Sequence, residues 1–233
     1  MCTDCLSCQA LSKTYGRRTA LCGVTFAVAP GRITGLLGPN GSGKTTLIKL
    51  AAGLLTPSGG AVSVCGTPPG PASKALTAYL PDRVFLPLHC RVEDTLALFA
   101  DFFADFSRDK AAAMLADLKL EPRMKLSSMS KGTLEKLQLA LVMSRRARLY
   151  LLDEPIGGVD PAARAYILST IIRNYSEDAG MLLSTHLIAE VENLLDDAVF
   201  LREGRVVSAG LADDLRQREG KGLDAWFREV FAC

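Results

Sequence analysis

Gly38-Pro39-Asn40-Gly41-Ser42-Gly43-Lys44-Thr45-Thr46 satisfies the pattern G-x-x-x-x-G-K-[ST], and it directly follows the apolar, strand-like run at 33–37. Glycines let backbone N–H groups turn inward around phosphate oxygens, at distances where a Cβ atom would clash. Lys44 is then placed to reach the β- and γ-phosphates, and the Thr45 hydroxyl to ligate Mg²⁺. Residues 46–52 have helical character and would add the positive end of a helix beneath the phosphates. We therefore predict a loop that binds a nucleoside triphosphate, because a chance glycine-rich turn would not explain both flanking elements.

The composition describes a globular chain with little net charge. Its 233 residues suffice for one large or two small lobes. Charged residues make up 22% and the formal net charge is +2, so we expect no general electrostatic attraction to nucleic acid or to an anionic membrane. No apolar run reaches the roughly 18 residues of a membrane span, and the start, Met-Cys-Thr-Asp-Cys, lacks the regions of a signal peptide. We expect a soluble, cytosolic chain.

Seven cysteines, at positions 2, 5, 8, 22, 65, 90 and 233, are expected to be reduced, because their number is odd and no secretory signal is found. Cys2, Cys5 and Cys8 have a spacing that can offer several thiolates to zinc or to an iron–sulfur cluster. The stretch 5–11 also reads as a strand, in which alternate side chains face opposite sides and cannot all reach one metal. We favour the strand, and stoichiometric metal in the purified protein would overturn that choice.

The remaining chain alternates strand-like and helix-like stretches. Its β-rich start holds strand-like runs at 5–11, 24–28, 33–37 and 61–65. Residues 92–120 show helical periodicity, so we predict a helical insert at about 85–136 whose aromatic stripe packs a core. Apolar runs return at 149–152, 181–184 and 198–201. This alternation predicts a parallel sheet with crossover helices. Residues 202–233, with an amphipathic end at 223–231, are expected to be a packing tail.

Polar residues follow two of the predicted buried strands. Asp153 and Glu154 come directly after the run at 149–152, where P-loop folds place a second metal anchor. Asp153 would hold Mg²⁺, mainly through water, and Glu154 would polarise a water that attacks the γ-phosphate. A solvated carboxylate pair is the alternative. Because parallel strands open their carboxyl ends on the same edge, we predict that His186, Glu154 and Lys44 converge.

The order of these motifs resembles the ATP-binding subunit of an ATP-binding cassette (ABC) transporter over nearly the whole chain. Tyr15 matches the aromatic residue that stacks on adenine in that family, and His186 matches its switch histidine. The segment 129–133, Met-Ser-Lys-Gly-Thr, lies where the family keeps its signature Leu-Ser-Gly-Gly-Gln, and Gly-Gly-Val-Asp at 157–160 matches its D-loop. The resemblance implies ATP and Mg²⁺ as cofactors, and ATP hydrolysis as the activity.

The resemblance also implies a fold and a set of site residues. We expect an α/β P-loop fold with a RecA-like parallel-sheet core, an N-terminal antiparallel β subdomain and an inserted α-helical subdomain. The chain 1–233 would be one ABC domain, with its core at 1–84 and 137–233 and the helical subdomain at 85–136 carrying the signature at its end. The catalytic residues would be Lys44, Glu154 and His186, and the metal ligands Thr45, Asp82 and Asp153. The nucleotide would be contacted by Tyr15, Gly38, Pro39, Asn40, Gly41, Ser42, Gly43, Lys44, Thr45, Thr46, Ser130, Gly132 and Asp160.

Members of the family work as head-to-tail pairs, so the resemblance implies a site shared between two chains. Ser130 and Gly132 of one subunit would bond the γ-phosphate held by Lys44 of the other, although the Ser130 segment alone reads only as a helix N-cap. The pair would be a homodimer or a heterodimer with a related chain. Its closing and opening would drive a separate transmembrane permease docked on the helical insert. This chain would then be a peripheral subunit on the cytoplasmic face of the cell membrane.

Two residues depart from the family pattern. Asp82, in the stretch Tyr-Leu-Pro-Asp, stands where the family usually has a glutamine that contacts Mg²⁺ and senses the permease. A carboxylate can still coordinate Mg²⁺, but it cannot donate a hydrogen bond as an amide does. Lys131 replaces the first glycine of the signature, and its ammonium would either strengthen binding of the partner-held γ-phosphate or point to solvent.

Three functions fit these features. The first is an ATPase that powers transport, and the Tyr-Leu-Pro-Asp and Ser-Lys-Gly stretches resemble small subunits of bacterial drug and antibiotic-peptide exporters. The second is a soluble ABC-type ATPase acting on the ribosome or on nucleic acid, but such proteins usually carry two cassettes or long coiled coils. The third is a cassette that binds ATP without turnover, which Glu154 and His186 argue against. We expect the first, with no nucleic-acid partner.

Overall fold

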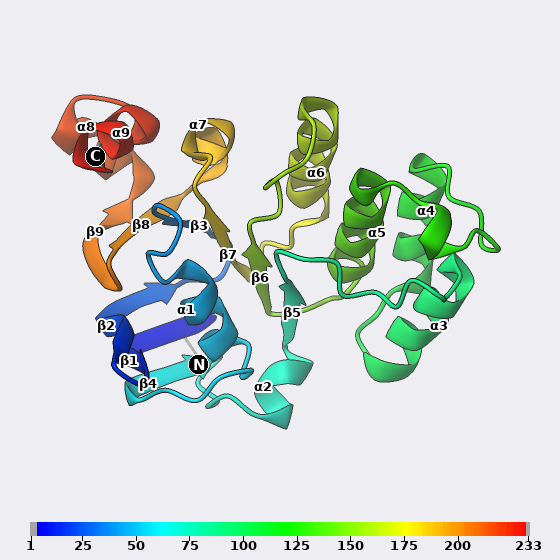
Figure 1. The fold of residues 1–233 in the computed structure, drawn as a ribbon, viewed down its shortest axis with the longest axis horizontal. Coiled ribbons are helices and arrows are strands. Elements are labelled where there is room, and N and C mark those ends of the chain that lie inside the picture. The colour runs from blue at the N-terminus through cyan, green and yellow to red at the C-terminus, as the bar shows by residue number, and fades with distance from the viewer. Residues whose placement is uncertain (1–3, 232–233) are drawn as a thin grey trace.

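Two β-sheets form the framework of the computed structural model, which describes residues 4–231 (Figure 1). The smaller sheet is antiparallel in the order β2-β1-β4, with strands β1 (Leu6–Tyr15), β2 (Arg18–Val28) and β4 (Gly59–Val64). The larger sheet has the order β5-β6-β7-β3-β8-β9. Its strands are β3 (Ile33–Leu37), β5 (Thr77–Leu80), β6 (Leu149–Asp153), β7 (Gly180–Thr185), β8 (Asp197–Arg202) and β9 (Arg205–Leu211). All neighbouring strands in it are parallel except β9, which runs antiparallel to β8.

The larger sheet is buried on both faces, which explains its continuous apolar runs. On β6, Tyr150 and Leu152 join one hydrophobic core, whereas Leu149 and Leu151 join another. This division follows the strand period of two. The smaller sheet and α1 (Lys44–Ala51) cover one face, and most of the later helices cover the other (Figure 1). The arrangement confirms the predicted α/β class with a parallel sheet and an N-terminal antiparallel β subdomain.

Most helices of the second face come from the last third of the chain. They are α6 (Pro161–Asn174), α7 (Ile188–Val191), α8 (Ala212–Glu219) and α9 (Leu223–Phe231), with a 3-10 turn at Glu192–Leu194. Between β4 and β5, the chain forms the short helix α2 (Pro71–Ala75). Across the part of the chain that the structure describes, every helix is too short or too polar to cross a bilayer.

The predicted helical insert forms a separate group with its own core, at the right of Figure 1. It contains α3 (Val92–Phe102), α4 (Arg108–Asp117), a 3-10 turn at Leu126–Ser128 and α5 (Lys131–Met143). Phe99 lies at its centre, with the ring centroids of Phe103 and Phe106 at 5.4 and 5.6 Å. The aromatic stripe therefore packs a core. Helix α5 runs through the predicted boundary at 136, because its later residues Leu139 and Met143 pack against the large sheet.

The C-terminal segment holds two elements that the sequence did not reveal, strand β9 and helix α8. Strand β9 lies at the edge of the large sheet, and its side chains are exposed or half-buried. It therefore lacks the apolar run that marks the buried strands. The amphipathic end at 223–231 is helix α9, which packs Trp226 and Phe227 against Phe200. The segment packs on the core as predicted, but it also extends the sheet.

The cysteines that suggested a metal site lie in the hydrophobic core. Cys5 and Cys8 are buried free thiols beside and within β1. Burial raises the pKa of Cys5 to about 11 and that of Cys8 to about 12, which disfavours the thiolate that a metal needs. Cys2 lies outside the described residues. Within residues 4–231, His, Cys, Asp and Glu side chains form no group of three or more that could hold a metal ion.

Candidate active site

The loop between β3 and α1 is shaped by glycines that no larger residue could replace. A Cβ atom on Gly38 would lie 2.3 Å from the carbonyl oxygen of Leu201, and one on Gly43 would lie 2.6 Å from that of Ala20. Gly43 also has a φ of 110°, in the region that favours glycine. The loop is thus held between β2 and β8, and it delivers backbone N–H groups at the N-terminus of α1.

The Lys44 ammonium joins this loop to the end of β6. Its side chain is only 5% exposed, and Nζ donates hydrogen bonds to the carbonyl oxygens of Gly38, at 2.8 Å, and Pro39, at 3.1 Å. The same Nζ lies 3.3 Å from Oε1 of Glu154. Two segments far apart in the sequence therefore meet through one buried cation.

Asp153 is fully buried at the end of β6 and has one oxygen available for a cation. Its Oδ1 accepts hydrogen bonds from Oγ1 of Thr45, at 3.2 Å, and from Oγ of Ser184, at 2.7 Å. Its Oδ2 is buried and has no hydrogen-bond partner among the residues described. Burial raises the pKa of this carboxyl, although the bonds from Ser184 and Thr45 oppose the shift. A buried oxygen without a partner is costly, so this site fits the oxygen-ligand chemistry of Mg²⁺.

Glu154 is held in an uncommon backbone conformation next to Asp153. Its φ is 49°, and its N–H donates to both the carbonyl oxygen and the hydroxyl of Ser184, each at 3.1 Å. Non-glycine residues in this region concentrate at functional sites. The carboxylate lies between two basic groups, with Oε2 at 3.1 Å from Nδ1 of His186 and Oε1 next to Lys44. The structure thus brings together the three residues that were predicted to converge.

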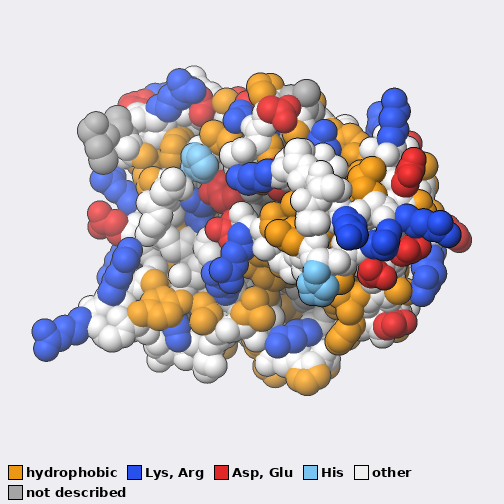
Figure 2. Space-filling view, turned by 45° about the vertical axis from the view of Figure 1, so that its right-hand side comes forward, with side chains coloured by type: hydrophobic (Ala, Val, Ile, Leu, Met, Phe, Trp, Pro, Cys, Tyr) orange, Lys and Arg blue, Asp and Glu red, His pale blue; other side chains and the backbone are white. Residues whose placement is uncertain are grey.

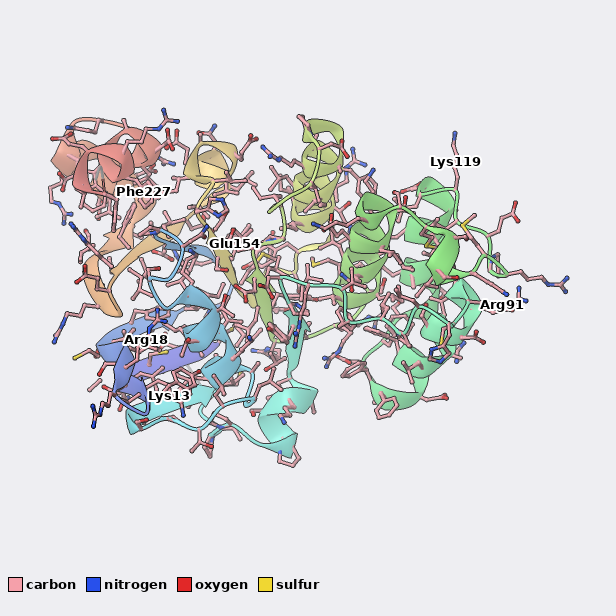
Figure 3. The ribbon with its side chains drawn as sticks, in the orientation of Figure 1. Lys13, Arg18, Arg91, Lys119, Glu154 and Phe227 are labelled. Carbon is pink, nitrogen blue, oxygen red and sulfur yellow. The ribbon has the colours of Figure 1, made fainter. Side chains whose placement is uncertain are left out.

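A pocket of about 650 Å³ opens beside the loop. Its lining combines Asn40, Gly41 and residues 43–46 of the loop with Tyr15, Asp82 and Glu154. Tyr15 is 45% exposed, as suits a ring that would stack on a base. Figure 3 shows Glu154 near the centre of the molecule, with Arg18 on the neighbouring small sheet. The pocket therefore has the phosphate loop, three acidic residues (Asp82, Glu154 and Glu203) and an aromatic ring on one connected surface.

Several residues of this site were not predicted from the sequence. Arg18 and Glu203 line the pocket, and Ser184 holds Asp153 and Glu154. For Ser184 a signal existed, because parallel strands in register place it beside Asp153. Glu203 and Gly204 form a two-residue turn between β8 and β9, with φ values of 48° and 75°. Nothing in the sequence indicated that this turn would reach the phosphate loop.

The remaining predicted residues form a second group, which we call the signature group: Ser130, Gly132 and Asp160. Ser130 caps α5 by accepting a hydrogen bond from the Thr133 N–H at 3.2 Å, and Asp160 caps α6 by accepting one from the Ala163 N–H at 2.9 Å. A Cβ atom on Gly132 would lie 3.8 Å from Oδ2 of Asp160, so the two caps are neighbours. Among the described residues that line the pocket, none belongs to the signature group.

Known proteins are similar to this chain in both sequence and fold. The family model described as ABC transporter matches residues 21–157. The Nod factor export ATP-binding protein I of Paraburkholderia xenovorans (strain LB400) is 32% identical over 209 residues, which cover 86% of this chain and 68% of that protein. The protein of the same name from Ralstonia nicotianae is 31% identical over 225 residues, covering 93% and 70%. A solved ATP-binding subunit of an ABC transporter is 33% identical, with a TM-score of 0.86 over 97% of this chain and 98% of that one.

Proposed function

Since this chain belongs to the ABC transporter family and is one of its ATP-binding ATPases, we propose that it powers export through a separate membrane-spanning subunit. The observation that carries the proposal is the meeting of Lys44, Glu154 and His186 beside the phosphate loop. Export is supported by relatives that are named as Nod factor export proteins. The chain spans about two thirds of the length of those relatives.

The phosphate end of the pocket has the groups that an ATP-Mg²⁺ complex requires. Loop N–H groups and Lys44 would bind the phosphates, and Thr45 and Asp153 would hold the metal, with Asp82 facing the same pocket. A bound Mg²⁺ supplies positive charge beside the β- and γ-phosphate oxygens. Tyr15 would stack on adenine.

Glu154 and His186 would act on the water that attacks the γ-phosphate. Glu154 is an acceptor whose backbone is fixed by Ser184 and whose carboxylate is held between Lys44 and His186. His186 contacts that carboxylate and is 38% exposed, which leaves its ring able to reach a phosphate oxygen. A positioned acceptor and a neighbouring donor are the parts that orient a water nucleophile.

The separation of the signature group from the pocket supports a site shared by two chains. The group lies at the N-termini of α5 and α6, where caps and backbone N–H groups favour an anion. In a head-to-tail pair, Ser130 and Gly132 of each chain would complete the pocket of the other. The second chain would be another copy or a related ATPase, and ATP would hold the two together.

A shared site makes turnover depend on protein concentration. Below the dissociation constant of the pair, we expect the ATPase rate of the purified chain to rise with about the square of its concentration, since two chains form one site. Phosphate release across a dilution series at saturating ATP measures this. Nucleotide binding at the same dilutions is the control and should not change. Strict proportionality between rate and concentration, down to the most dilute sample, would rule out the shared site.

An apolar patch on the helical subdomain would dock the membrane subunit. It consists of Phe85, Leu98 and Phe102, of which Phe102 is 75% exposed. These side chains border a cavity of about 220 Å³ whose lining also includes Phe99 and Arg145. Figure 2 brings this side of the molecule forward and shows orange hydrophobic side chains among charges of both signs. Exposed apolar patches mark interaction sites, and the mixed charges do not favour nucleic acid. The chain would thus be held at the cytoplasmic face of the membrane.

Replacing Phe102 with Asp should release the chain from membranes without impairing its own ATPase activity. A buried interface aromatic contributes about 2 kcal/mol or more, so we expect a loss of about 30-fold in affinity. The measurement is the amount of tagged chain in washed membranes of the organism that carries it, beside phosphate release by the purified variant. Ile172→Asp is the matched control, since Ile172 is 51% exposed on α6. Equal membrane recovery for both variants would remove the patch from the proposal.

A further inference from the structure

The ammonium of Lys131, the residue that departs from the family signature, lies at a junction of two segments. Lys131 directly follows the Ser130 cap, and its side chain is 69% exposed. Its Nζ is 3.6 Å from Oε1 of Glu135, one turn later on α5. A Cβ atom on Gly158, in the D-loop, would lie 3.2 Å from the same Nζ. The ammonium therefore lies beside two segments of its own chain, while the side chain stays largely exposed.

Glu135 is a weak partner for this ammonium. The separation of 3.6 Å exceeds the length of a direct charge-assisted hydrogen bond, which is about 2.8 Å. Glu135 is only 17% exposed, and its Oε2 is buried without a hydrogen-bond partner among the described residues. Burial raises the pKa of Glu135 more than Lys131 lowers it. The carboxylate is thus poorly stabilised in its charged form, and a phosphate near Lys131 can compete for the cation.

We propose that Lys131 changes partners when two chains close on ATP. Its ammonium would move away from Glu135 of its own chain and bind the γ-phosphate held by Lys44 of the other chain. This inference rests on the shared site of the proposed function. Ser130 is proposed to contact that same phosphate, and a lysine stem of four methylenes lets the neighbouring ammonium reach it. Glu135 is then a positioning residue, since it acts only by restraining Lys131.

This exchange of partners gives Lys131 and Glu135 opposite effects on the strength of ATP-dependent pairing. Lys131 adds a cation to the phosphate, so its loss should weaken ATP-dependent pairing. Glu135 competes with the phosphate for that cation, so its neutralisation should strengthen pairing. Once Lys131 is absent, Glu135 has nothing to restrain and its replacement should have no effect. A merely structural role of either residue would not produce this pattern.

The test measures the dissociation constant of the ATP-bound pair by sedimentation, in a Glu154→Gln background that hydrolyses ATP slowly. Lys131→Met should raise the constant about tenfold or more, as expected for a lost bond to a charged group. Glu135→Gln should lower it about threefold, the scale of a partly exposed ion pair. The double variant Lys131→Met, Glu135→Gln should match Lys131→Met. Lys131→Arg, which keeps the charge, should retain most of the pairing.

Lys119→Met is the matched control, because Figure 3 shows Lys119 directed away from the molecule. It removes the same charge and should leave the constant unchanged, and ATP affinity of the dilute monomer should be unchanged in all variants. If Glu154→Gln forms no ATP-dependent pair, the shared site and this inference both fail. If the pair forms but Lys131→Met behaves like Lys119→Met, only the inference fails. If Glu135→Gln weakens pairing, Glu135 supports Lys131 rather than restraining it, and the exchange is wrong.

Discussion

Replacing Glu154 with Gln is expected to reduce ATP turnover by at least about 10²-fold while ATP still binds, the scale of a lost general base. Glutamine keeps the shape of the side chain and can still contact His186, but it cannot accept a proton from water. It also removes the negative charge that lies 3.3 Å from Lys44. The ammonium is then free to bind phosphate, so ATP affinity should stay equal or increase. Phosphate release and nucleotide titration on the same preparation measure the two effects.

Glu203→Gln is the matched control for this change. Glu203 lines the same pocket, but from the turn between β8 and β9. Its neighbour Gly204 attaches the turn through backbone hydrogen bonds, which the substitution leaves intact. This variant should hydrolyse ATP at close to the normal rate. Turnover of Glu154→Gln within a few-fold of the unmodified chain would exclude Glu154 as the base.

Replacing Lys44 with Ala should weaken ATP binding itself, by about 10²-fold. The side chain would make charge-assisted bonds to two phosphates, and bonds of this kind contribute about 1.5–3 kcal/mol each. The substitution also leaves Glu154 without its nearest cation beside the γ-phosphate, which adds repulsion to the loss. Titration of the purified variant with a fluorescent ATP analogue gives the affinity directly.

Two controls separate this effect from damage to the loop. Lys44 donates to the carbonyl oxygens of Gly38 and Pro39, so the thermal unfolding midpoint of the variant should be compared with that of the unmodified chain. Lys49→Ala removes a lysine from the last turn of the same helix and should leave ATP affinity within about twofold, as for most surface changes. Affinity of Lys44→Ala equal to that of Lys49→Ala would contradict the assignment of the phosphate loop.

The sequence predicts those parts of the fold whose pattern is local and buried. The strand before the phosphate loop was assigned correctly from an apolar run, and the convergence of His186 with Glu154 follows from the common direction of parallel strands. Strand β9 was missed because its exposure gives it no apolar run, and α5 continues past the predicted boundary because it contributes side chains to two different cores. Both features depend on contacts between distant segments, which periodicity does not report.

The surroundings of the two carboxylates also depend on contacts that the sequence does not report. Asp153 and Glu154 are adjacent in the sequence, yet one is buried against two hydroxyls and the other lies between a lysine and a histidine. Only the register of β6 with β7 brings Ser184 to both of them. The residue types were therefore enough to identify the chemistry. The hydrogen-bond and ion-pair partners of each carboxylate became known only from the three-dimensional structure.

The position of β3 in the large sheet has a consequence for the synthesis of this protein. The strand that precedes the phosphate loop lies between β7 and β8, which belong to the last quarter of the chain. The loop itself receives a hydrogen bond at the Ser42 carbonyl from Gly204, later still. While the ribosome is making the chain, the loop thus has neither its flanking strands nor this brace until residues 180–204 have been translated. ATP therefore cannot stabilise the loop in a shorter nascent chain, and it becomes a folding ligand only after β7, β8 and the turn at Gly204 have joined the loop.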